Sequence, residues 1–553
     1  MEKPHPDLSD TLSARHWAWL PLAAAVVIGL VWLILAFGQA DAVQDDARQH
    51  VAWLEAMRDP ELFRGDFIAS FFVSSNTPLF KGFYWLPAQA GISPLVMAKL
   101  YPVALTLLTA WLAWRFFLTT GIGGLAAALG AVVFVQGIWA SDDIASATAR
   151  AFAWPMLLAV LVCWRERRFL PGAGLGVVLA LTYPSAAVFA GAMIGLAHLP
   201  DLRGRPAWPE LRQRWAGPAL IIAGMAAGAV FLLATGTAKG MVSLAEARAM
   251  VEFGPKGRTS FFGKGPLSYW LFSKRSGAMP ETALRHAVLV VAAVAALVTW
   301  RRLPGTLKHM VLAAALAGFL LWAAAHLLLF RLYLPARFPL MGLRLALSLL
   351  AGAGLAAWLL HVGERTRRSA VAALLAVPLL ALAVPLKALN LINLPDAPTL
   401  MQALRSAPKD ALVAGFSPDL DNIPSDVQRR VLTAREFHLP YNRAYVREMR
   451  ARLGDTAQAV FADGPEGVRV LAARYGVTHL LIDRVEVTPE GVAHSWWRPI
   501  LAQEGRLPAC SAEACRVWAL EPEQRRCVVA EDRQQTLLSV ACLVGDDSRP
   551  QAE

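Results

Sequence analysis

Charged residues are scarce in this chain: 17% of its 553 residues are Asp, Glu, Lys or Arg, whereas 56% are hydrophobic. Soluble domains usually carry about 25% charged residues, so a large part of the chain is expected to lie in a bilayer. Nucleotide-phosphate loops, Rossmann fingerprints and H-E-x-x-H motifs are also missing from the sequence. A site that consumes ATP or a nucleotide sugar is therefore not expected.

Cysteine is also scarce, with five residues, and four of them fall near the C-terminus. These four, Cys510, Cys515, Cys527 and Cys542, are expected to form two disulfides in a domain outside the cytoplasm. Sequence-close pairing, 510–515 with 527–542, is our preference among three connectivities. A zinc site is the alternative, although no C-x-x-C pair is present.

The positive charge of the chain lies in its hydrophobic part. The formal net charge is +12, but from Pro395 onward 19 Lys/Arg stand against 22 Asp/Glu, so the basic excess precedes Pro395. Short loops rich in Lys and Arg are typical of the cytoplasmic side of bacterial-type membrane proteins. Nucleic-acid binding is not expected, because no soluble segment combines a basic patch with interleaved aromatic residues.

Stretches long and apolar enough to span a bilayer recur along the chain, since a span needs about 20 such residues. The first lacks a small-residue cleavage site and is interpreted as an anchor helix. A further piece, Pro171–Leu199, carries Tyr183-Pro184 in its middle and arginine-rich loops on both sides, so we expect two short helices forming a hairpin. The total is about eleven spans. The single spans are Trp17–Ala40, Pro94–Leu118, Gly121–Ala140, Thr148–Trp164, Pro218–Thr235, Ala283–Trp300, Met310–Phe330, Leu340–His361 and Ser369–Leu389.

The fold class that follows is mainly α: a polytopic helix bundle with a C-terminal soluble α/β domain. We expect a bacterial inner-membrane protein with a cytoplasmic N-terminus (1–16), a transmembrane domain (17–393) and a periplasmic domain (394–553). Loops 41–93 and 238–281, and a short loop around Asp142-Asp143, then lie outside. In the C-terminal domain the expected strands are Ala411–Phe416, Thr478–Asp483, Cys515–Leu520 and short strands within Cys527–Val544, and the expected helices are Tyr441–Phe461 and Asp463–Tyr475.

The loop after the first span carries the candidates for catalysis. Asp45 and Asp46 follow that span almost directly, and His50 lies about one helical turn further on. The apolar spacing from Val51 to Met57 is typical of a helix lying on a membrane surface. A carboxylate there can take a proton from an attacking hydroxyl; the alternative is that one Asp merely caps the helix.

Basic residues on the same side are candidates for binding the phosphate of a lipid-linked substrate. The stretch FGPKGRTSFFGKGP (253–266) resembles a mobile lid, and Arg150 and Arg337 lie near span ends, where a buried charge is costly unless paired. For any one of them, a solvated loop charge or a snorkelling side chain is the alternative. The substrate- or phosphate-binding residues we predict are His50, Arg64, Lys81, Arg150, Lys256, Arg258, Lys264 and Arg337. Other basic residues of the second large loop are Lys239, Arg248, Lys274 and Arg275.

This arrangement of spans, acidic outer loop, second large outer loop and outer C-terminal domain resembles the GT-C membrane glycosyltransferases. The resemblance covers roughly residues 17–390 and rests, at residue level, on Asp45-Asp46; YGVTHLLIDR (475–484) resembles the tail-domain ending of uncharacterised bacterial relatives. The resemblance to the GT-C glycosyltransferases implies an inverting hexosyl or pentosyl transfer from a polyprenyl-phosphate sugar to a glycan, lipid or protein acceptor. Asp45 or Asp46 would be the base, and Lys81, Arg150 and the 256–264 segment would hold the leaving phosphate.

No cofactor is expected, and no obligatory metal, because the oligosaccharyltransferase metal pattern is not evident in the sequence. Two other readings stay open. One is a non-enzymatic component or scaffold of polysaccharide or lipid export, and the other is an O-antigen-type polymerase or ligase. Acidic residues are scarce within the spans, which argues against an ion-coupled transporter.

Overall fold

The structure of the chain is a computed structural model. It describes residues 14–38, 42–199, 208–234, 240–262, 265–279, 293–294, 296–298, 300–332, 334–361, 391–392, 398–508, 510 and 514–545. Of the predicted spans, Ser369–Leu389 and most of Ala283–Trp300 lie outside these residues.

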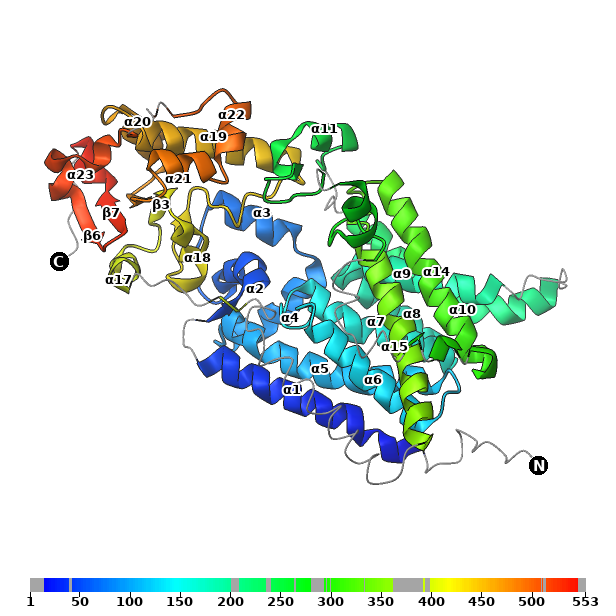
Figure 1. The fold of residues 1–553 in the computed structure, drawn as a ribbon. Coiled ribbons are helices and arrows are strands. Elements are labelled where there is room, and N and C mark those ends of the chain that lie inside the picture. The colour runs from blue at the N-terminus through cyan, green and yellow to red at the C-terminus, as the bar shows by residue number, and fades with distance from the viewer. Residues whose placement is uncertain are drawn as a thin grey trace, which may run out of the picture.

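Apolar helices pack side by side into a bundle below the C-terminal domain (Figure 1). Within the part of the chain that the structure describes, five of them are long and apolar enough to cross a membrane. These are α1 (Trp19–Gly38), α5 (Pro94–Leu118), α10 (Trp208–Ala234), α14 (Gly305–Leu327) and α15 (Arg337–His361). Shorter helices of the bundle are α6 (Gly124–Trp139), α7 (Ala149–Arg165), α8 (Phe169–Thr182) and α9 (Pro184–His198). The bounds agree with the predicted spans to within a few residues, except that α10 begins at Trp208 rather than Pro218.

The predicted break at Tyr183-Pro184 is present. Helix α8 ends at Thr182 and α9 begins at Pro184, while Tyr183 between them has φ −147° and ψ 88°, outside helical geometry. A residue that precedes proline is pushed away from the helical region because the proline ring clashes with it. That the two helices enter and leave the bilayer as a hairpin, and do not cross it once, stays a prediction.

Glycines let α15 approach its neighbours closely. A Cβ atom on Gly352 would overlap the carbonyl oxygen of Ala126 in α6, and one on Gly342 would overlap the carbonyl oxygen of Ala314 in α14. Small residues at such crossings allow helix backbones to pack directly against each other in membranes. The N-terminal half of α15, which carries two arginines of the site described below, is therefore held firmly against the bundle.

The loop after α1 folds into short elements instead of one surface helix. They are β1 (Val43–Gln44), α2 (Asp45–His50), a 3₁₀ helix (Ala52–Met57), α3 (Phe67–Ser75) and α4 (Pro78–Gln89). Gln44 caps α2 by accepting a 3.0 Å hydrogen bond from the Ala47 N–H, so the Asp residues are not the N-cap. The prediction of a helix lying on the membrane is also wrong, because Val51 and Leu54 are fully buried in the protein core.

The second large loop contains α11 (Leu244–Ala249), a 3₁₀ turn (Val251–Phe253) and a π-helix (Ser268–Phe272). Its Gly- and Phe-rich stretch is packed, not free: Phe253 and Phe261 are buried, and the Phe253 ring stacks on Phe330 at 5.0 Å. The Arg258 side chain of this stretch pairs with Glu436 of the C-terminal domain. The described part of the expected lid is thus anchored to the C-terminal domain.

The C-terminal domain is built on a five-stranded sheet with the order β4-β3-β5-β7-β6. The interior strand β3 pairs in parallel with β4 on one side and β5 on the other, and β7 and β6 are antiparallel. All five residues of β3 are buried, as expected for an interior parallel strand. The strands are β3 (Leu412–Phe416), β4 (Arg430–Val431), β5 (His479–Asp483), β6 (Val528–Glu531) and β7 (Gln535–Ser539), and a separate pair joins β1 to β2 (Leu391–Ile392).

Helices cover this sheet. They are α17 (Pro398–Ser406), α18 (Ile423–Asp426), α19 (Arg443–Val460), α20 (Glu466–Tyr475), α21 (Pro489–His494), α22 (Arg498–Gln503) and α23 (Val540–Val544). Helix α20 ends at Gly476 in the left-handed conformation, as the sequence predicts. The strand expected over Cys515–Leu520 is wrong: that segment holds an isolated bridge and a 3₁₀ turn, and the stretch after β7 forms α23.

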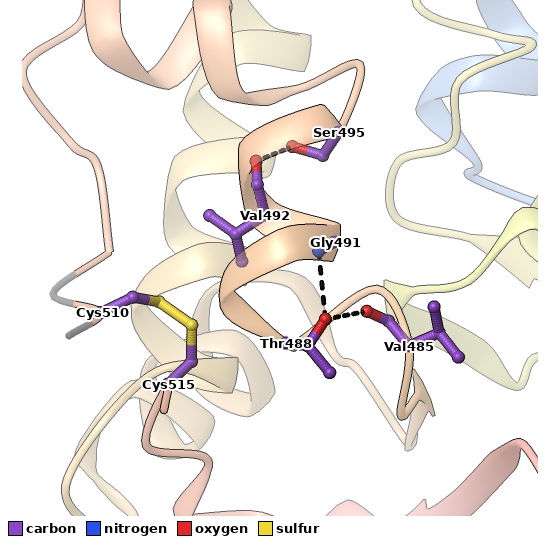
Figure 2. Close-up of a disulfide and its surroundings, with 7 residues drawn as sticks. All are labelled: Val485, Thr488, Gly491, Val492, Ser495, Cys510 and Cys515. Atoms are coloured by element: carbon purple, nitrogen blue, oxygen red, sulfur yellow. Dashed lines mark hydrogen bonds between the residues drawn. A yellow bond between two sulfur atoms is a disulfide. The ribbon is translucent and has the colours of Figure 1, made fainter. Parts of the chain in front are cut away.

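Two disulfides are present near the C-terminus, Cys510–Cys515 and Cys527–Cys542. Figure 2 shows the first beside α21, whose N-terminus is capped by Thr488, which accepts a 3.0 Å hydrogen bond from the Gly491 N–H. The pairing joins cysteines that are close in sequence. Cys163, in the bundle, is free.

The first loop and the C-terminal domain share one hydrophobic core. Trp53 is fully buried, with its ring 5.0 Å from that of Phe437, and Phe71 stacks on Tyr445 at 3.6 Å. Figure 1 shows α2 and α3 between the bundle and the yellow-to-red C-terminal domain. The loops after β3 and β4 leave the same edge of the sheet, since parallel strands end together, and both reach this junction.

Candidate functional site

A cavity of about 950 Å³ lies where the bundle, the two large loops and the C-terminal domain meet. Its wall is assembled from α2, α3, the α6–α7 loop, α7, α15, the second large loop and the segments after β3 and β4. Of the predicted site residues, it brings together Asp45, Asp46, His50, Arg150, Arg258 and Arg337. Arg64, Lys81 and Lys256 do not line it, and Lys264 lies outside the described residues.

Asp46 is held by an arginine from another part of the chain. Arg150, in the first turn of α7, donates a hydrogen bond to the Asp46 carboxylate and another of 3.0 Å to Asp142. Burial alone would raise the pKa of Asp46, but the positive charge of Arg150, together with more distant Arg337 and Arg258, outweighs it and lowers that pKa. Asp46 is therefore an ionised carboxylate facing the cavity.

The short α6–α7 loop supplies a second acidic pair, Asp142 and Asp143. Burial raises the pKa of Asp142 to about 6, although Arg150 opposes the change. Asp142 has φ 54°, a left-handed conformation that Asp tolerates better than most residues. The sequence did show two adjacent acids between apolar helices, a costly placement that indicates buried partners, but their role in the site was missed.

Asp143 is the most enclosed carboxylate of the cavity wall. Its side chain is 3% exposed, and Arg344 of α15 donates a 2.5 Å hydrogen bond to it. Burial would raise the pKa of Asp143, but Arg344 and Arg150 lower it. The three carboxylates of Asp46, Asp142 and Asp143 are thus neutralised by three arginines, Arg150, Arg344 and, 3.9 Å from Asp143, Arg337.

A separate ionic cluster joins α2 to the C-terminal domain. Arg48 donates a 2.7 Å hydrogen bond to Asp45 and lies 3.4 Å from the carboxylate of Glu436, which also pairs with Arg258. Burial raises the pKa of Glu436 to about 7 against the opposing charge of Arg258. Asp45 is thus directed toward Arg48, whereas Asp46 is directed toward Arg150.

His50 lines the cavity with its ring edge against Phe72, 5.5 Å between centroids. Burial lowers its pKa to about 4, and the nearby Asp46 carboxylate only partly offsets this. Near pH 7 the imidazole is uncharged. It can exchange hydrogen bonds with a substrate there but adds no positive charge.

Further cations on the cavity wall are Lys274 and Arg275, which follow the π-helix, and Arg435, which follows β4. Among the described residues, the side chains of these three make no ion pair. Sequence reasoning grouped Lys274 and Arg275 with other loop charges and did not select them. Nothing in their spacing distinguishes them, because their approach to the site depends on tertiary structure.

A metal site is not formed by the described part of the chain, in which no group of three or more His, Cys, Asp and Glu is placed to hold an ion. The cavity carboxylates of Asp46, Asp142 and Asp143 are gathered around the guanidinium of Arg150.

No protein-family model and no curated protein matches the chain. Among solved structures, it is similar to the oligosaccharyltransferase AglB of Archaeoglobus fulgidus in complex with an inhibitory peptide and a dolichol-phosphate, at 12% identity and a TM-score of 0.47, over 87% of this chain and 71% of that one. It is also similar to the mycobacterial arabinofuranosyltransferase AftD, at 15% identity and a TM-score of 0.45, over 96% of this chain and 42% of that one.

Both are membrane glycosyltransferases of the GT-C type, the class that the sequence resembles. With such low identities and TM-scores below 0.5, these similarities carry no argument about the chemistry of the cavity. The chemistry of the cavity is inferred from the residues that line it.

Proposed function

We propose that this membrane protein is a glycosyltransferase that moves a sugar from a polyprenyl-phosphate donor to an acceptor hydroxyl or amine. The observation that supports the proposal most directly is that one cavity wall carries both an ionised carboxylate, Asp46, and two cations, Lys274 and Arg275, that make no ion pair among the described residues. A base and an anion-binding surface are what a displacement at a sugar phosphate requires.

In the proposed reaction the acceptor oxygen or nitrogen attacks the anomeric carbon while Asp46 takes its proton. The bond from that carbon to the phosphate oxygen breaks, and the electron pair leaves with polyprenyl phosphate. Lys274 and Arg275, with Arg337, would stabilise the charge that develops on the phosphate. A single displacement of this kind inverts the configuration at the anomeric carbon.

Asp46 suits the role of base better than Asp45. Its partner Arg150 fixes its orientation toward the cavity, whereas Asp45 is engaged by Arg48 of its own helix. The lowered pKa keeps Asp46 ionised over the whole neutral range. Asp45 serves in our proposal to hold Arg48 at the junction with the C-terminal domain.

The cavity is proposed to face the outer side of a bacterial inner membrane. The arginine-rich loops at 165–168 and 203–214 would then be cytoplasmic, in accord with the positive-inside rule. Nucleotide sugars are not available on that side, which favours a donor carried by the membrane itself. The hydrophobic bundle beside the cavity would accommodate the polyprenyl chain.

The test is to incubate the purified protein with a pool of polyprenyl-phosphate sugars and acceptor glycans, and to follow free polyprenyl phosphate by mass spectrometry. Asp46→Asn is expected to lower release by about 10²–10⁴-fold, the usual contribution of a catalytic base. Asp45→Asn is the matched control and should retain most of the activity. If no donor is consumed by the folded wild-type protein, a non-enzymatic role in export becomes the better reading.

A further inference from the structure

Asp143 lies on the cavity wall, yet its carboxylate is fully engaged within the protein. One oxygen accepts hydrogen bonds from Arg344, from Trp154 Nε1 at 3.3 Å and from Ser141 Oγ at 3.2 Å. The other oxygen faces Arg150 Nε at 3.5 Å and Arg337 Nη1 at 3.9 Å. With both oxygens occupied and 3% of the side chain exposed, Asp143 can influence a reaction only through its neighbours.

Arg344 reaches Asp143 from inside the helix bundle. Its side chain is 4% exposed, and it also donates a 2.7 Å hydrogen bond to Ser141 Oγ. Its guanidinium lies over the ring of Trp154, 5.0 Å from the centroid. Because glycine contacts hold α15 closely against α6 and α14, the position of Arg344 is set by the packing of the bundle.

Arg150 stands between this buried pair and the cavity. Its Nη2 contacts Asp46 and Asp142, while its Nε faces Asp143. The guanidinium is therefore shared between carboxylates of two loops. How strongly Asp143 draws on Arg150 depends on how much of the Asp143 charge is already neutralised by Arg344.

We propose that Arg344 is a positioning residue that determines, through Asp143, whether the Arg150 guanidinium binds mainly Asp143 or Asp46. When Arg344 is present, it neutralises most of the Asp143 charge, and Arg150 stays hydrogen-bonded to Asp46. Without Arg344, the buried Asp143 carboxylate pulls Arg150 toward itself and away from Asp46. The effect on Asp46 stands by itself, whereas any effect on turnover rests on the proposed glycosyltransferase function.

A purely structural role would explain less. A buried ion pair contributes little net stability compared with apolar residues of the same volume, because desolvation of its charges cancels much of the attraction. The Arg344–Asp143 pair is therefore not explained by stability alone. Through Asp143 it acts on Arg150, which contacts the Asp46 carboxylate in the cavity.

The two halves of the pair give opposite expectations for Asp46. Arg344→Gln draws Arg150 off Asp46, so burial dominates and the pKa of Asp46 rises. Asp143→Asn leaves Arg150 to Asp46 and Asp142, so the pKa of Asp46 falls. In the double variant, the pKa of Asp46 is expected to lie between the values of the two single variants. The other charged or titratable groups that face Asp46 are not mutated, namely Asp45, Arg48, His50, Arg258 and Arg337. Arg337 also lies 3.9 Å from Asp143, and its charge shifts the pKa of Asp46 in the same direction as that of Arg150.

The measurement is carbodiimide labelling of Asp46 in the full-length purified protein as a function of pH, read by peptide mass spectrometry. Only a protonated carboxyl reacts readily, so the midpoint of labelling reports the pKa without any need for activity. We expect a midpoint at least about 1 pH unit higher in Arg344→Gln and a lower one in Asp143→Asn, with Arg344→Lys near the wild type because it keeps the charge.

Glu166→Gln is the matched control, because it removes the acidic partner of Arg115 in an ion pair between bundle helices that does not border the cavity. It should leave the midpoint unchanged. Equal midpoints in all variants, or shifts in the same direction for both halves of the pair, would overturn the proposal. If Arg344→Gln does not fold, Arg344→Met and Asp143→Asn are compared in its place.

The same variants separate this proposal from the proposed function. In the release assay, Arg344→Gln should lower kcat about 10- to 100-fold with little change in the KM for the donor, because Asp46 loses the arginine that orients it while Lys274 and Arg275 are unchanged. Midpoint shifts without release by the wild-type protein would refute the glycosyltransferase function alone. Release without midpoint shifts would refute the positioning role alone.

Discussion

Arg48, in the first loop, donates a 2.6 Å hydrogen bond to Asn422, which lies 374 residues further along the chain, and both side chains are buried. Asn422 belongs to the segment that follows β3, an interior strand of the C-terminal sheet. In open parallel sheets, ligand sites form outside the carboxyl ends of the strands where the strand order reverses. Here that edge of the sheet meets α2 and completes the wall of the cavity.

Asn422→Ala should weaken the attachment of the C-terminal domain. The change leaves a buried guanidinium short of a partner, and a hydrogen bond to a charged group contributes about 1.5–3 kcal/mol. Thermal and denaturant unfolding of the purified protein would measure the loss. Lys409→Ala is the control, because it breaks an ion pair with Asp59 at the same junction that is exposed to solvent and therefore screened. An equal loss of stability in both variants would contradict the expectation that the buried Arg48–Asn422 hydrogen bond stabilises the junction more than the exposed Lys409–Asp59 ion pair.

Glu436→Gln should change how stability depends on pH. The folded pKa of Glu436 is raised to about 7 by burial, above the unfolded value of about 4.3. The folded state therefore binds the proton more tightly, so the contribution of Glu436 favours folding at low pH and is lost as pH rises through that interval. The wild-type protein should lose stability relative to Glu436→Gln between about pH 4.5 and 7, by up to about 3 kcal/mol. If the difference in the free energy of unfolding between the two proteins stays constant over this pH range, the shifted pKa is contradicted.

Replacing Lys274 and Arg275 together by Gln should raise the KM for the lipid-linked donor about 10-fold or more, with a smaller effect on kcat. Both side chains line the cavity and make no ion pair among the described residues, so their charge is available to an anionic substrate. Higher ionic strength should weaken the wild-type interaction and bring the two proteins closer together. Lys256→Gln is the matched control, since Lys256 is an exposed residue of the same loop that does not line the cavity.

Removal of the two disulfides should have unequal effects. Cys527–Cys542 closes a loop with a sequence separation of 15, and Cys510–Cys515 one of 5. Loop-closure entropy predicts a loss of about 3 kcal/mol for the longer loop and about 2 kcal/mol for the shorter one. Unfolding of the double Cys→Ala variants of each pair would show the order. A larger loss for the shorter loop would indicate that local packing, not chain entropy, dominates.

The hairpin at Tyr183-Pro184 can be tested by labelling. A cysteine at Trp208, whose side chain is 73% exposed at the start of α10, should react with a membrane-impermeant maleimide only when the cytoplasmic side is open. A variant that also carries Cys163→Ser provides the background without the free native thiol. Labelling from the outer side in intact cells would mean that Pro171–Leu199 crosses the bilayer once.

The sequence predicted the helices of the bundle well, because an apolar run of given length has few structural alternatives. It also predicted β3 and β5, whose short apolar runs are bounded by clear stop signals such as Gly476. The segment around Cys515 was harder, since a disulfide can hold a short loop that has no strand pattern. The burial of Val51 and Leu54 depended on tertiary packing against the helix bundle, where they share a core with Phe80 and Tyr84.

The cavity was predictable only in part, for the same physical reason. Asp45 and Asp46 stood out as an acidic pair directly after the first span. Arg150 stood out as a charge at a span end, where an unpaired ion is costly. That Asp46 and Arg150 meet each other, and that Asp142 and Asp143 meet them, follows from helix packing that no local pattern reports. Lys81 and Arg64 had equally suitable charges but lie on parts of the loop that turn away from the cavity.

The shared core between Trp53 and Phe437 has a consequence for the order of events during biosynthesis. The N-terminal bundle and the Asp46 loop leave the ribosome first, without the wall that Asn422 and Glu436 provide. The cavity can close only after the final third of the chain has been translated and has docked on the loop. A chain that stops early, or that is cut between the bundle and β3, would therefore expose Trp53 and its aromatic neighbours and be recognised as incomplete by cellular quality control.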